Sequence, residues 1–229
     1  MITVIIPTLN VDQALESTLS ALVPAVVSGV VKQLVVSDGG SQDHTVALAH
    51  EAGADIVTGP TGRGNQLALG AAAARGDWLL FLHADTLLEP GWDLEVKQFI
   101  AEARAAGDLE RVAYFRFRLN DRKTAARWLE RIVSVRCRFL ALPYGDQGLL
   151  ISKTFYETLG GFKNIPLMED VELVRRVGRG RLIALHHAAI TSAARYRREG
   201  YLKRALRNAS CLAMWFAGVA PERILRFYR

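Results

Sequence analysis

The chain has 229 residues, of which 50% are hydrophobic and 23% are charged, and its formal net charge is +6. This composition excludes a disordered tail, a collagen-like repeat and a small disulfide-stapled scaffold, and the length suffices for one domain with a sizeable core. The basic balance is compatible with a nucleic acid, an anionic membrane or a phosphate-bearing substrate as partner. Cys137 and Cys211 lack the spacing of a zinc cluster, so a reducing cytoplasm is the expected compartment.

Neither end of the sequence predicts a targeting or membrane-spanning segment. The first residues lack a basic leader, and their apolar run is too short for a signal peptide. The uncharged stretch over 208–221 is shorter than the ~20 apolar residues that a spanning helix needs. We therefore expect a cytoplasmic protein, with peripheral association at the inner face of the membrane left open.

Short apolar runs alternate with helical patterns in the first part of the chain. Strands are expected over 2–6, 33–37, 55–58 and 78–82, and helices over 12–27, 43–52 and 65–74, with Asn65 as the N-cap of the last helix. This alternation predicts a mostly parallel sheet in a three-layer α/β fold. Ligands of such sheets bind beyond the carboxyl ends of the strands, where residues 7–10, 38–41 and 83–85 lie.

From Val112 the pattern changes to the alternation of a half-buried strand, expected in a mixed region of the sheet. A basic amphipathic helix is expected over 123–140, with an apolar line at steps of three or four formed by Trp128, Ile132, Val135 and Phe139. A loop and strand follow over 145–152, a helix over 170–177, a strand over 182–185 and a final helix over 200–216.

Acidic residues follow several of these elements. Asp85 comes just after a buried strand, where a carboxylate either binds a hard divalent cation or caps the next turn. Asp38 precedes Gly39, and this pair either approaches a ligand through its backbone and carboxylate or forms an ordinary turn. Asp146, followed by Gln147, adds another acidic group in a loop.

Two further motifs have both a chemical and a structural interpretation. Glu169 and Asp170 open a helix, where one serves as general base while the other orients it, or both stabilise the helix dipole. Arg63 in a glycine-rich turn before a helix forms an anion site or is a solvated side chain. The Gly161-Phe162 turn places the ring against an acceptor or the core.

Taken together, these strings resemble the family 2 glycosyltransferases with the GT-A fold, over roughly residues 1–200. The strings follow the order of the family: Val4-Ile5-Ile6-Pro7-Thr8-Leu9-Asn10, Val36-Ser37-Asp38-Gly39-Gly40-Ser41, Gly62-Arg63-Gly64, Phe81-Leu82-His83-Ala84-Asp85-Thr86, Gly145-Asp146-Gln147-Gly148, Gly160-Gly161-Phe162 and Glu169-Asp170. Each motif alone is weak evidence for the family, but the whole set, in this order and at the ends of strands, is specific for it.

The resemblance implies an inverting, metal-dependent enzyme that moves a sugar from a nucleoside diphosphate sugar, with a UDP-sugar favoured, to an acceptor hydroxyl. The implied substrate-binding residues are Pro7, Thr8, Asn10, Asp38, Gly39, Arg63, His83, Ala84, Asp146, Gln147, Gly161 and Phe162. Asp85 is the implied Mn²⁺ or Mg²⁺ ligand, Asp170 the general base and Glu169 its partner. It also implies a nucleotide-sugar half over 1–86, an acceptor half over 87–200 and a C-terminal helical extension over 201–229.

Three departures from the family pattern affect these expectations. Val11 follows Asn10 where the family often has an acidic residue, and His83 stands where many members have an aspartate. The Gln-x-x-Arg-Trp motif of processive synthases is absent, which argues against a polymer synthase. Arg195 begins a basic string in about the same region and is a candidate to approach the diphosphate.

Three other functions stay in view. A nucleotide-sugar-binding or regulatory protein without transfer activity is the main alternative, but both Asp85 and the Glu169-Asp170 pair favour an enzyme. A nucleic-acid partner is not expected, because the chain lacks a helix-turn-helix, zinc or RNA-binding signature. A nucleotidyltransferase needs a glycine-rich, lysine-containing loop after the first strand, and residues 7–13 do not provide one.

The acceptor is unknown, and a lipid or another phosphate-bearing compound is considered. The helix over 123–140 and the C-terminal segment form either an anionic-surface or lipid-phosphate site or solvated faces and partner contacts; the basic residues of that segment are Lys203, Arg204, Arg207, Arg223, Arg226 and Arg229. Apolar residues of the last helix dock on the core or on the other subunit of a homodimer; they are Met214, Trp215 and Phe216.

Overall fold

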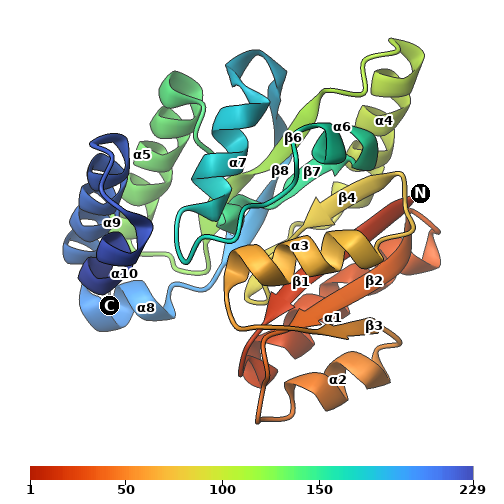
Figure 1. The fold of residues 1–229 in the computed structure, drawn as a ribbon, viewed down its shortest axis with the longest axis horizontal. Helices are drawn as coiled ribbons and strands as arrows, with labels where there is room; N and C mark the ends of the chain where they lie inside the picture. Colours follow the sequence, from red (N-terminus) through yellow and green to blue (C-terminus); the bar gives the residue numbers. More distant parts are fainter. Residues whose placement is uncertain (229) are drawn as a thin grey trace.

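One eight-stranded sheet runs through the protein, in a computed structural model that describes residues 1–228. The strands are β1 (Ile2–Thr8), β2 (Val31–Asp38), β3 (Asp55–Thr58), β4 (Trp78–Phe81), β5 (Thr86–Leu88), β6 (Val112–Leu119), β7 (Leu149–Ser152) and β8 (Leu182–Thr191). Their order across the sheet is β3-β2-β1-β4-β7-β6-β8-β5 (Figure 1).

Helices cover both faces of this sheet (Figure 1). They are α1 (Asp12–Val27), α2 (Thr45–Glu51), α3 (Arg63–Ala73), α4 (Trp92–Ala105), α5 (Thr124–Leu140), α6 (Lys153–Thr158), α7 (Glu169–Val177), α8 (Ala194–Glu199), α9 (Tyr201–Phe216) and α10 (Pro221–Tyr228). Alternate strand residues point to opposite faces, so Val4 packs with α1 and α4, whereas Ile5 packs with α3. The three-layer α/β architecture expected from the sequence is confirmed.

The two parts of the sheet differ in strand direction. β1 lies between β2 and β4 and is parallel to both, and β3 continues the parallel arrangement. β7 is antiparallel to β4 and β6, while β8 is parallel to β6 and antiparallel to the edge strand β5. The expected mixed region around β6 is therefore confirmed. Parallel pairing brings the ends of β1 and β2 together, with Thr8 opposite Asp38.

The helix α3 begins earlier than its sequence predicts. It starts at Arg63, so Asn65 lies inside the helix and the expected N-cap is wrong. Gly62 occupies the N-cap position with a φ of 145°, a backbone conformation that residues other than glycine rarely adopt. The glycine thus ends the preceding loop and lets the helix start at Arg63.

The apolar line expected on the amphipathic helix α5 does not face the core. Its four residues are Trp128, Ile132, Val135 and Phe139, and their exposed fractions range from 55% to 61%. The face that packs against the sheet consists of Ala126, Leu129, Val133 and Cys137. These residues form a second apolar line, and its two small members allow the helix to approach the strands closely.

The C-terminal helices pack against α5 and α7. An apolar cluster joins them to the rest of the fold; its buried members are Leu142, Met168, Val171, Cys211 and Ile224. Met214 and Trp215 are partly buried against this cluster, whereas Phe216 is 52% exposed. Arg229 lies outside the described residues. Within residues 1–228, no helix combines the length and the apolar character that crossing a membrane requires. Cys137 and Cys211 are buried free thiols.

Candidate active site

The carboxyl ends of β1 and β2 are joined by hydrogen bonds. The Thr8 hydroxyl donates to Asp38 Oδ1 at 2.9 Å, and the Gly39 amide donates to the Thr8 carbonyl at 2.9 Å. Farther out, the Asn10 amide donates to the Ser41 hydroxyl at 2.9 Å. Thr8 and Asp38 are buried, and Asn10 is exposed at the rim. Pro7 is partly buried immediately before Thr8, so the first two predicted binding strings form one edge.

Asp38 is the centre of this edge. Besides Thr8, the Ser41 hydroxyl donates to Oδ1 at 2.5 Å, and the Gly40 and Ser41 amides donate to Oδ2 at 2.8 and 2.7 Å. Burial alone would raise the pKa of Asp38, but these hydrogen bonds outweigh it and lower the pKa. A carboxylate has about four acceptor positions. Asp38 uses them to shape the loop, and the expected contact with a nucleotide base stays a prediction.

Gln66 is a site-organising residue that sequence reasoning missed. It is 5% exposed, and its Nε2 donates to the carbonyls of Thr8 and Ser37 at 2.6 and 3.0 Å. A Cβ on Gly39 would lie 3.1 Å from this amide group, so glycine leaves the room that Gln66 occupies. No sequence signal distinguishes Gln66 from an ordinary polar residue of a helix surface.

The first turn of α3 contacts the segment that leads into α7. Arg63 Nε lies 3.7 Å from Glu169 Oε1, with exposed side-chain fractions of 45% and 2% respectively. A Cβ on Gly64 would lie 2.4 Å from the carbonyl oxygen of Lys163, so α3 packs closely on the segment before α7. Arg63 therefore lies between the start of α3 and the start of α7, with its side chain partly open to solvent.

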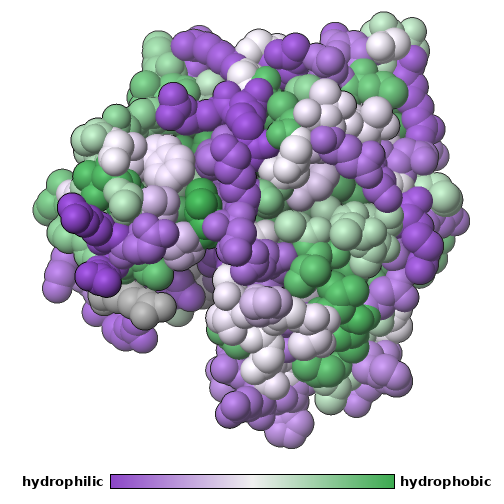
Figure 2. Space-filling view, in the orientation of Figure 1, coloured by the Kyte–Doolittle hydropathy of each residue, from purple (hydrophilic) through white to green (hydrophobic). Residues whose placement is uncertain are grey.

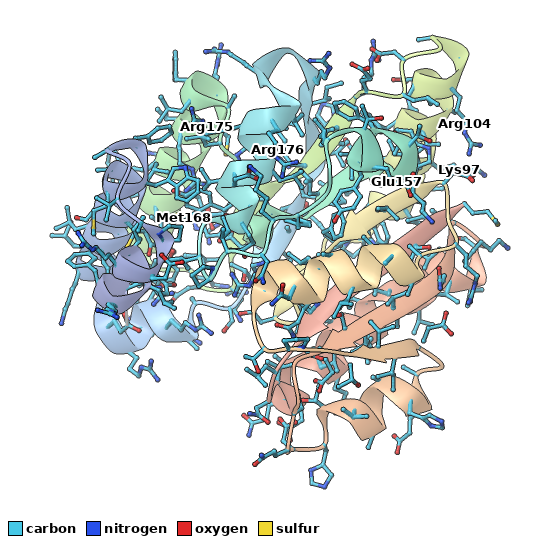
Figure 3. The ribbon with its side chains drawn as sticks, in the orientation of Figure 1. Lys97, Arg104, Glu157, Met168, Arg175 and Arg176 are labelled. Atoms are coloured by element: carbon cyan, nitrogen blue, oxygen red, sulfur yellow. The ribbon has the colours of Figure 1, made fainter. Side chains whose placement is uncertain are left out.

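The helix α7 presents the predicted acidic pair at its first turn. Met168, which is labelled in Figure 3, has a left-handed φ of 68° and precedes this turn. Asp170 Oδ1 accepts from the Val171 amide and Oδ2 from the Gly145 amide, both at 2.7 Å. The helix N-terminus favours negative charge here. These bonds hold the Asp170 carboxylate beside the loop that contains Asp146.

The buried carboxyl groups affect one another. Burial raises the pKa of Glu169 to about 7, with a further rise from the Asp170 charge and an opposing effect of Arg63. Glu169 is therefore close to its titration range at neutral pH. Its position behind Arg63 suits a positioning role, whereas Asp170 lies nearer the surface.

Asp146 belongs to the same group of charges. Burial raises its pKa to about 6; Arg136 opposes this rise, and the charges of Asp170 and Asp85 add to it. Its Oδ1 has no hydrogen-bond partner among residues 1–228. A buried acceptor without a donor is costly, so this atom is suited to binding a cation or a substrate hydroxyl.

His83 lies between the strand end and this loop. Burial and the positive charges of Arg63 and Arg195 hold the pKa of His83 well below 6.5, so its imidazole is neutral at neutral pH. A Cβ on Gly145 would lie 2.7 Å from His83 Nε2, so a larger residue there would force the imidazole or the loop to shift. The predicted basic residue Arg195, on α8, is thus near the site.

A small cavity of about 20 Å³ connects these elements. Its walls include His83 from the end of β4, Gly145 from the loop, and Glu169 and Asp170 from α7. Phe162 also lines it, with its ring edge-on to Phe81 at 4.9 Å. The structure therefore brings the predicted catalytic pair next to the strand end that carries Asp85.

Some predicted substrate-binding residues form hydrogen bonds within the protein that support the site. Gln147 is 2% exposed; its Nε2 donates to the Phe115 carbonyl at 3.0 Å, and its Oε1 accepts from Arg136 at 3.2 Å. Ala84 is buried, and its carbonyl accepts from the Thr18 hydroxyl at 2.7 Å. The Gly161 carbonyl accepts from Arg176 at 2.7 Å. These contacts hold the strand end and loops in position.

The donor set fits a hard divalent cation only in part. Across residues 1–228, no three side chains of the metal-ligating kinds converge on one point. However, Asp85 lies close enough to raise the pKa of Asp146, whose Oδ1 is unpartnered. Mg²⁺ commonly binds through one or two carboxylates together with substrate phosphates. Asp85 and Asp146 fit that kind of site.

Comparison with known proteins identifies the family. The model described as Glycosyl transferase family 2 matches residues 3–150, which is more than half of the chain. The chain belongs to glycosyl transferase family 2. This membership confirms the resemblance noted from the motifs and the class of enzyme that it implies.

Curated relatives in this glycosyl transferase family match a limited segment. Glucosyl-3-phosphoglycerate synthase from Mycobacterium tuberculosis (strain ATCC 25618 / H37Rv) is 33% identical over 95 residues, which cover 38% of this chain and 29% of the relative. The enzyme from Mycolicibacterium smegmatis is 32% identical over 98 residues, covering 39% and 32%. The chain spans less than a third of the length of the curated relatives it matches.

Solved structures support the fold over most of the chain. The Mycobacterium tuberculosis glucosyl-3-phosphoglycerate synthase with Mn²⁺, UDP-glucose and phosphoglyceric acid has a TM-score of 0.61 at 21% identity, covering 96% of this chain and 80% of that one. S. aureus TarS 1–349 has a TM-score of 0.64 at 16% identity, covering 90% and 64%. These likenesses confirm the GT-A fold.

Proposed function

We propose that this protein is an inverting glycosyltransferase that transfers a sugar from a UDP-sugar to an acceptor hydroxyl with the help of a divalent cation. The observation that carries the proposal is the convergence of Asp85, Asp146 and the Glu169-Asp170 pair at one edge of the sheet. This edge supplies separate carboxylates for a cation and for proton transfer, as sugar transfer from a diphosphate requires.

The nucleotide lies, in this proposal, along the joined ends of β1 and β2. Thr8, Asn10 and Gly39 line that edge, and their backbone is already fixed by hydrogen bonds. Arg63 at the start of α3 faces the diphosphate, because a guanidinium beside a helix N-terminus favours an anion. UDP is the preferred nucleotide, since a fold relative was solved with UDP-glucose and Mn²⁺.

Asp85 and Asp146 would hold the cation of the donor. When bound, Mn²⁺ or Mg²⁺ neutralises the negative charge of the diphosphate. His83, neutral and next to Gly145, shapes the wall of this site. Arg195 adds positive charge near His83 and so assists the leaving group.

Asp170 acts as the general base. Its carboxylate takes the proton of the acceptor hydroxyl while that oxygen attacks the anomeric carbon of the sugar. The bond between that carbon and the diphosphate oxygen breaks, and its electron pair leaves with the diphosphate. A single in-line displacement inverts the anomeric centre. Glu169 keeps Arg63 beside the reacting groups through their 3.7 Å contact.

We assign a phosphate-bearing hydroxyl compound as the acceptor class. The support is chemical: the acceptor side places Arg136 beside Asp146 and Arg195 near His83. Fold relatives were solved with phosphoglyceric acid and with glycerol 3-phosphate. The alternative is a nucleotide-sugar-binding protein without transfer activity, which would retain the donor edge but not require Asp170.

Calorimetric titration with UDP and GDP, with and without Mn²⁺, tests the donor site. We expect UDP to bind more tightly when Mn²⁺ is present. Asp85→Ala should abolish this gain, whereas Asp108→Ala, at a partly exposed residue that pairs with Arg111 at 3.0 Å, should retain it. Absence of binding by either nucleotide would reject the donor site, and an unchanged gain in Asp85→Ala would place the cation elsewhere.

Transfer itself is measured with UDP-glucose and 3-phosphoglycerate or glycerol 3-phosphate, following the anomeric configuration of the product. A product with inverted anomeric configuration supports a single in-line displacement with Asp170 as general base. Retention of configuration would overturn the proposed mechanism. UDP binding without turnover on any phosphate-bearing acceptor would favour the non-catalytic alternative.

A further inference from the structure

The outer face of α5 carries apolar side chains that the fold leaves in solvent. The α5 stripe consists of Trp128, Ile132, Val135 and Phe139, and each of these residues is at least 55% exposed. They lie at steps of three or four, so they form one line along the helix. Contiguous exposed apolar surface of this kind marks an interaction site more often than an ordinary protein surface.

The same flank of the molecule continues onto α9. The two helices lie beside each other (Figure 1), and green residues occur among purple ones over this side of the molecule (Figure 2). Leu202 and Leu206 on α9 are 73% and 59% exposed, and Phe216 at its end is 52% exposed. The neighbouring helix α9 therefore exposes apolar side chains as well.

Cations border the α5 stripe. The Arg131 guanidinium lies 5.5 Å from the ring centroid of Trp128, and that of Arg138 lies 6.0 Å from the ring centroid of Phe139. Each aromatic end of the stripe thus has an arginine beside it. Arginine next to an aromatic ring suits the boundary between the headgroups and the acyl chains of a bilayer.

A groove of about 680 Å³ runs beside α5 and adds to this charge. Arg131 and Arg138 line it from the helix, Arg116 from β6, and Arg179 from the turn before β8. Arg179 donates to the carbonyls of Arg138 and Phe139, which holds it at the groove. Glu130 also lines the groove, but its arginines outnumber this one carboxylate, so the groove is wide and basic enough for phosphate headgroups.

Negative charge is scarce on these helices. Glu130 is the only acidic residue in the sequence of α5, and the sequence of α9 has none. The Glu130 side chain is 15% exposed and is bound by Arg127 at 2.8 Å. The exposed face of α5 is therefore apolar and cationic, without a carboxylate to offset its arginines.

We propose that this flank docks on an anionic lipid bilayer, with the α5 stripe at the acyl boundary and the arginines at the level of the phosphates. Basic amphipathic helices bind such surfaces through apolar burial and charge together. A second copy of the chain fits less well, because a symmetric contact through α5 would bring the same arginines together without carboxylates between them. This docking is independent of the proposed sugar transfer.

Co-sedimentation with vesicles tests the proposal. We expect the full chain to bind phosphatidylcholine vesicles that contain about a third phosphatidylglycerol, but not pure phosphatidylcholine, and to be released by high salt. Ile132→Glu should lower binding by roughly tenfold or more, and so should the double change Arg131→Glu with Arg138→Glu.

Leu94→Glu and Lys97→Glu on α4 are the matched controls. Leu94 is 67% exposed, and Lys97 lies on the opposite side of the view from α5 (Figure 3). Both controls should bind as the wild type does, and UDP binding should be unchanged in every variant. Absence of binding to anionic vesicles at low salt overturns the proposal, as does an equal loss in the controls.

Self-association is measured in parallel by sedimentation velocity. A concentration-dependent dimer that Ile132→Glu abolishes, without vesicle binding, would overturn the bilayer proposal in favour of a subunit interface. Quenching of tryptophan fluorescence by brominated lipid provides an independent check, because Trp128→Phe should remove most of the quenching if the stripe enters the bilayer.

Discussion

Carboxyl groups at the proposed donor edge, around Asp38, and at the proposed acceptor side, around Glu169 and Asp146, have pKa values shifted in opposite directions. At the donor edge, the Asp38 carboxylate accepts four hydrogen bonds, which lower its pKa. At the acceptor side, burial raises the pKa of Glu169 to about 7 and that of Asp146 to about 6. The Asp38 carboxylate is satisfied internally, whereas Asp146 keeps a buried oxygen without a hydrogen-bond partner among residues 1–228.

This difference indicates how work is divided between the two regions. The donor edge presents a rigid backbone surface, which suits the binding of a nucleotide without rearrangement. The acceptor side places the partly exposed Asp170 carboxylate beside the loop of Asp146, whose Oδ1 is unpartnered among residues 1–228, which suits proton transfer and cation binding. Arg63 connects the two through its contact with Glu169.

The largest expected effect comes from removing the proposed base. Asp170→Asn should lower the turnover number by roughly 10²–10⁴-fold, because the amide cannot accept the acceptor proton. UDP affinity should stay within about twofold, since Asp170 lies on the acceptor side. Steady-state transfer assays and calorimetry measure the two quantities. A variant that loses UDP binding as strongly as turnover would contradict the separation of the two regions.

The sequence predicts the parallel core, and its motifs mark the residues proposed for the site, because both depend on local patterns. β3 matches its expected range, and the ordered motifs locate Asp85 and Asp170 at the ends of elements that meet. The direction of β7 depends on long-range pairing, which no local pattern records. Likewise, α5 has two apolar lines, and only packing against the sheet selects the one with Leu129 and Val133.

Contacts inside the site were also beyond the sequence. Gln66 resembles a surface residue, and Gln147 stands in a motif that implies substrate contact. The supporting role of both appears only when their amides meet backbone carbonyls that are distant in the sequence. The local sequence around Asp38 favours a turn former over a ligand residue, because Asp-Gly is a common turn signal. The structure shows the turn-forming bonds directly.

Asp38→Ala tests the internally satisfied edge. Removing the carboxylate leaves the Thr8 and Ser41 hydroxyls and two amides without an acceptor, so the free energy of unfolding should fall by about 3 kcal/mol. UDP affinity should fall as well, because the loop loses its shape. Asp93→Ala is a suitable control, since Asp93 accepts one bond, from the Ser28 hydroxyl at 3.3 Å. Urea unfolding measures the stability of both variants, and calorimetry measures their UDP affinity. Equal losses of stability in Asp38→Ala and Asp93→Ala would show that the four bonds of Asp38 do not stabilise the fold.

Gly145→Ala tests the close packing of the acceptor side. The new methyl group would lie 2.7 Å from His83 Nε2 and 3.5 Å from Asp170 Oδ2, so the loop must shift away from the base. We expect the turnover number to fall by roughly 10- to 100-fold with UDP affinity nearly unchanged. The control is Gly180→Ala, where a Cβ meets no described atom within 4 Å. Full activity of Gly145→Ala would show that this approach is not needed for transfer.

Glu95 tests whether raised carboxyl pKa values are a feature of the whole acceptor half or only of the residues at the site. It lies on α4 in the acceptor half, and its carboxylate accepts from the backbone amides of His186 and His187 at 2.6 and 3.0 Å. Burial alone would raise its pKa, but these bonds and contacts with both imidazole rings lower the pKa to about 2. Away from the site, a carboxylate of the acceptor half is thus as well satisfied as Asp38.

A lowered pKa stabilises the fold where the carboxylate is ionised, and the gain is lost as pH falls through the folded pKa. We therefore expect Glu95→Gln to lower the free energy of unfolding at pH 7 by about 1–2 kcal/mol, after allowance for solvent screening. The gap between variant and wild type should shrink as pH falls from about 4.5 to 2. Glu102→Gln on the same helix, which loses only a bond to Gln98, should show a smaller gap. If the difference in unfolding free energy between Glu95→Gln and wild type does not depend on pH, the charge of Glu95 does not stabilise the fold. The poorly satisfied carboxylates would then be a feature of the whole acceptor half and not of the site alone.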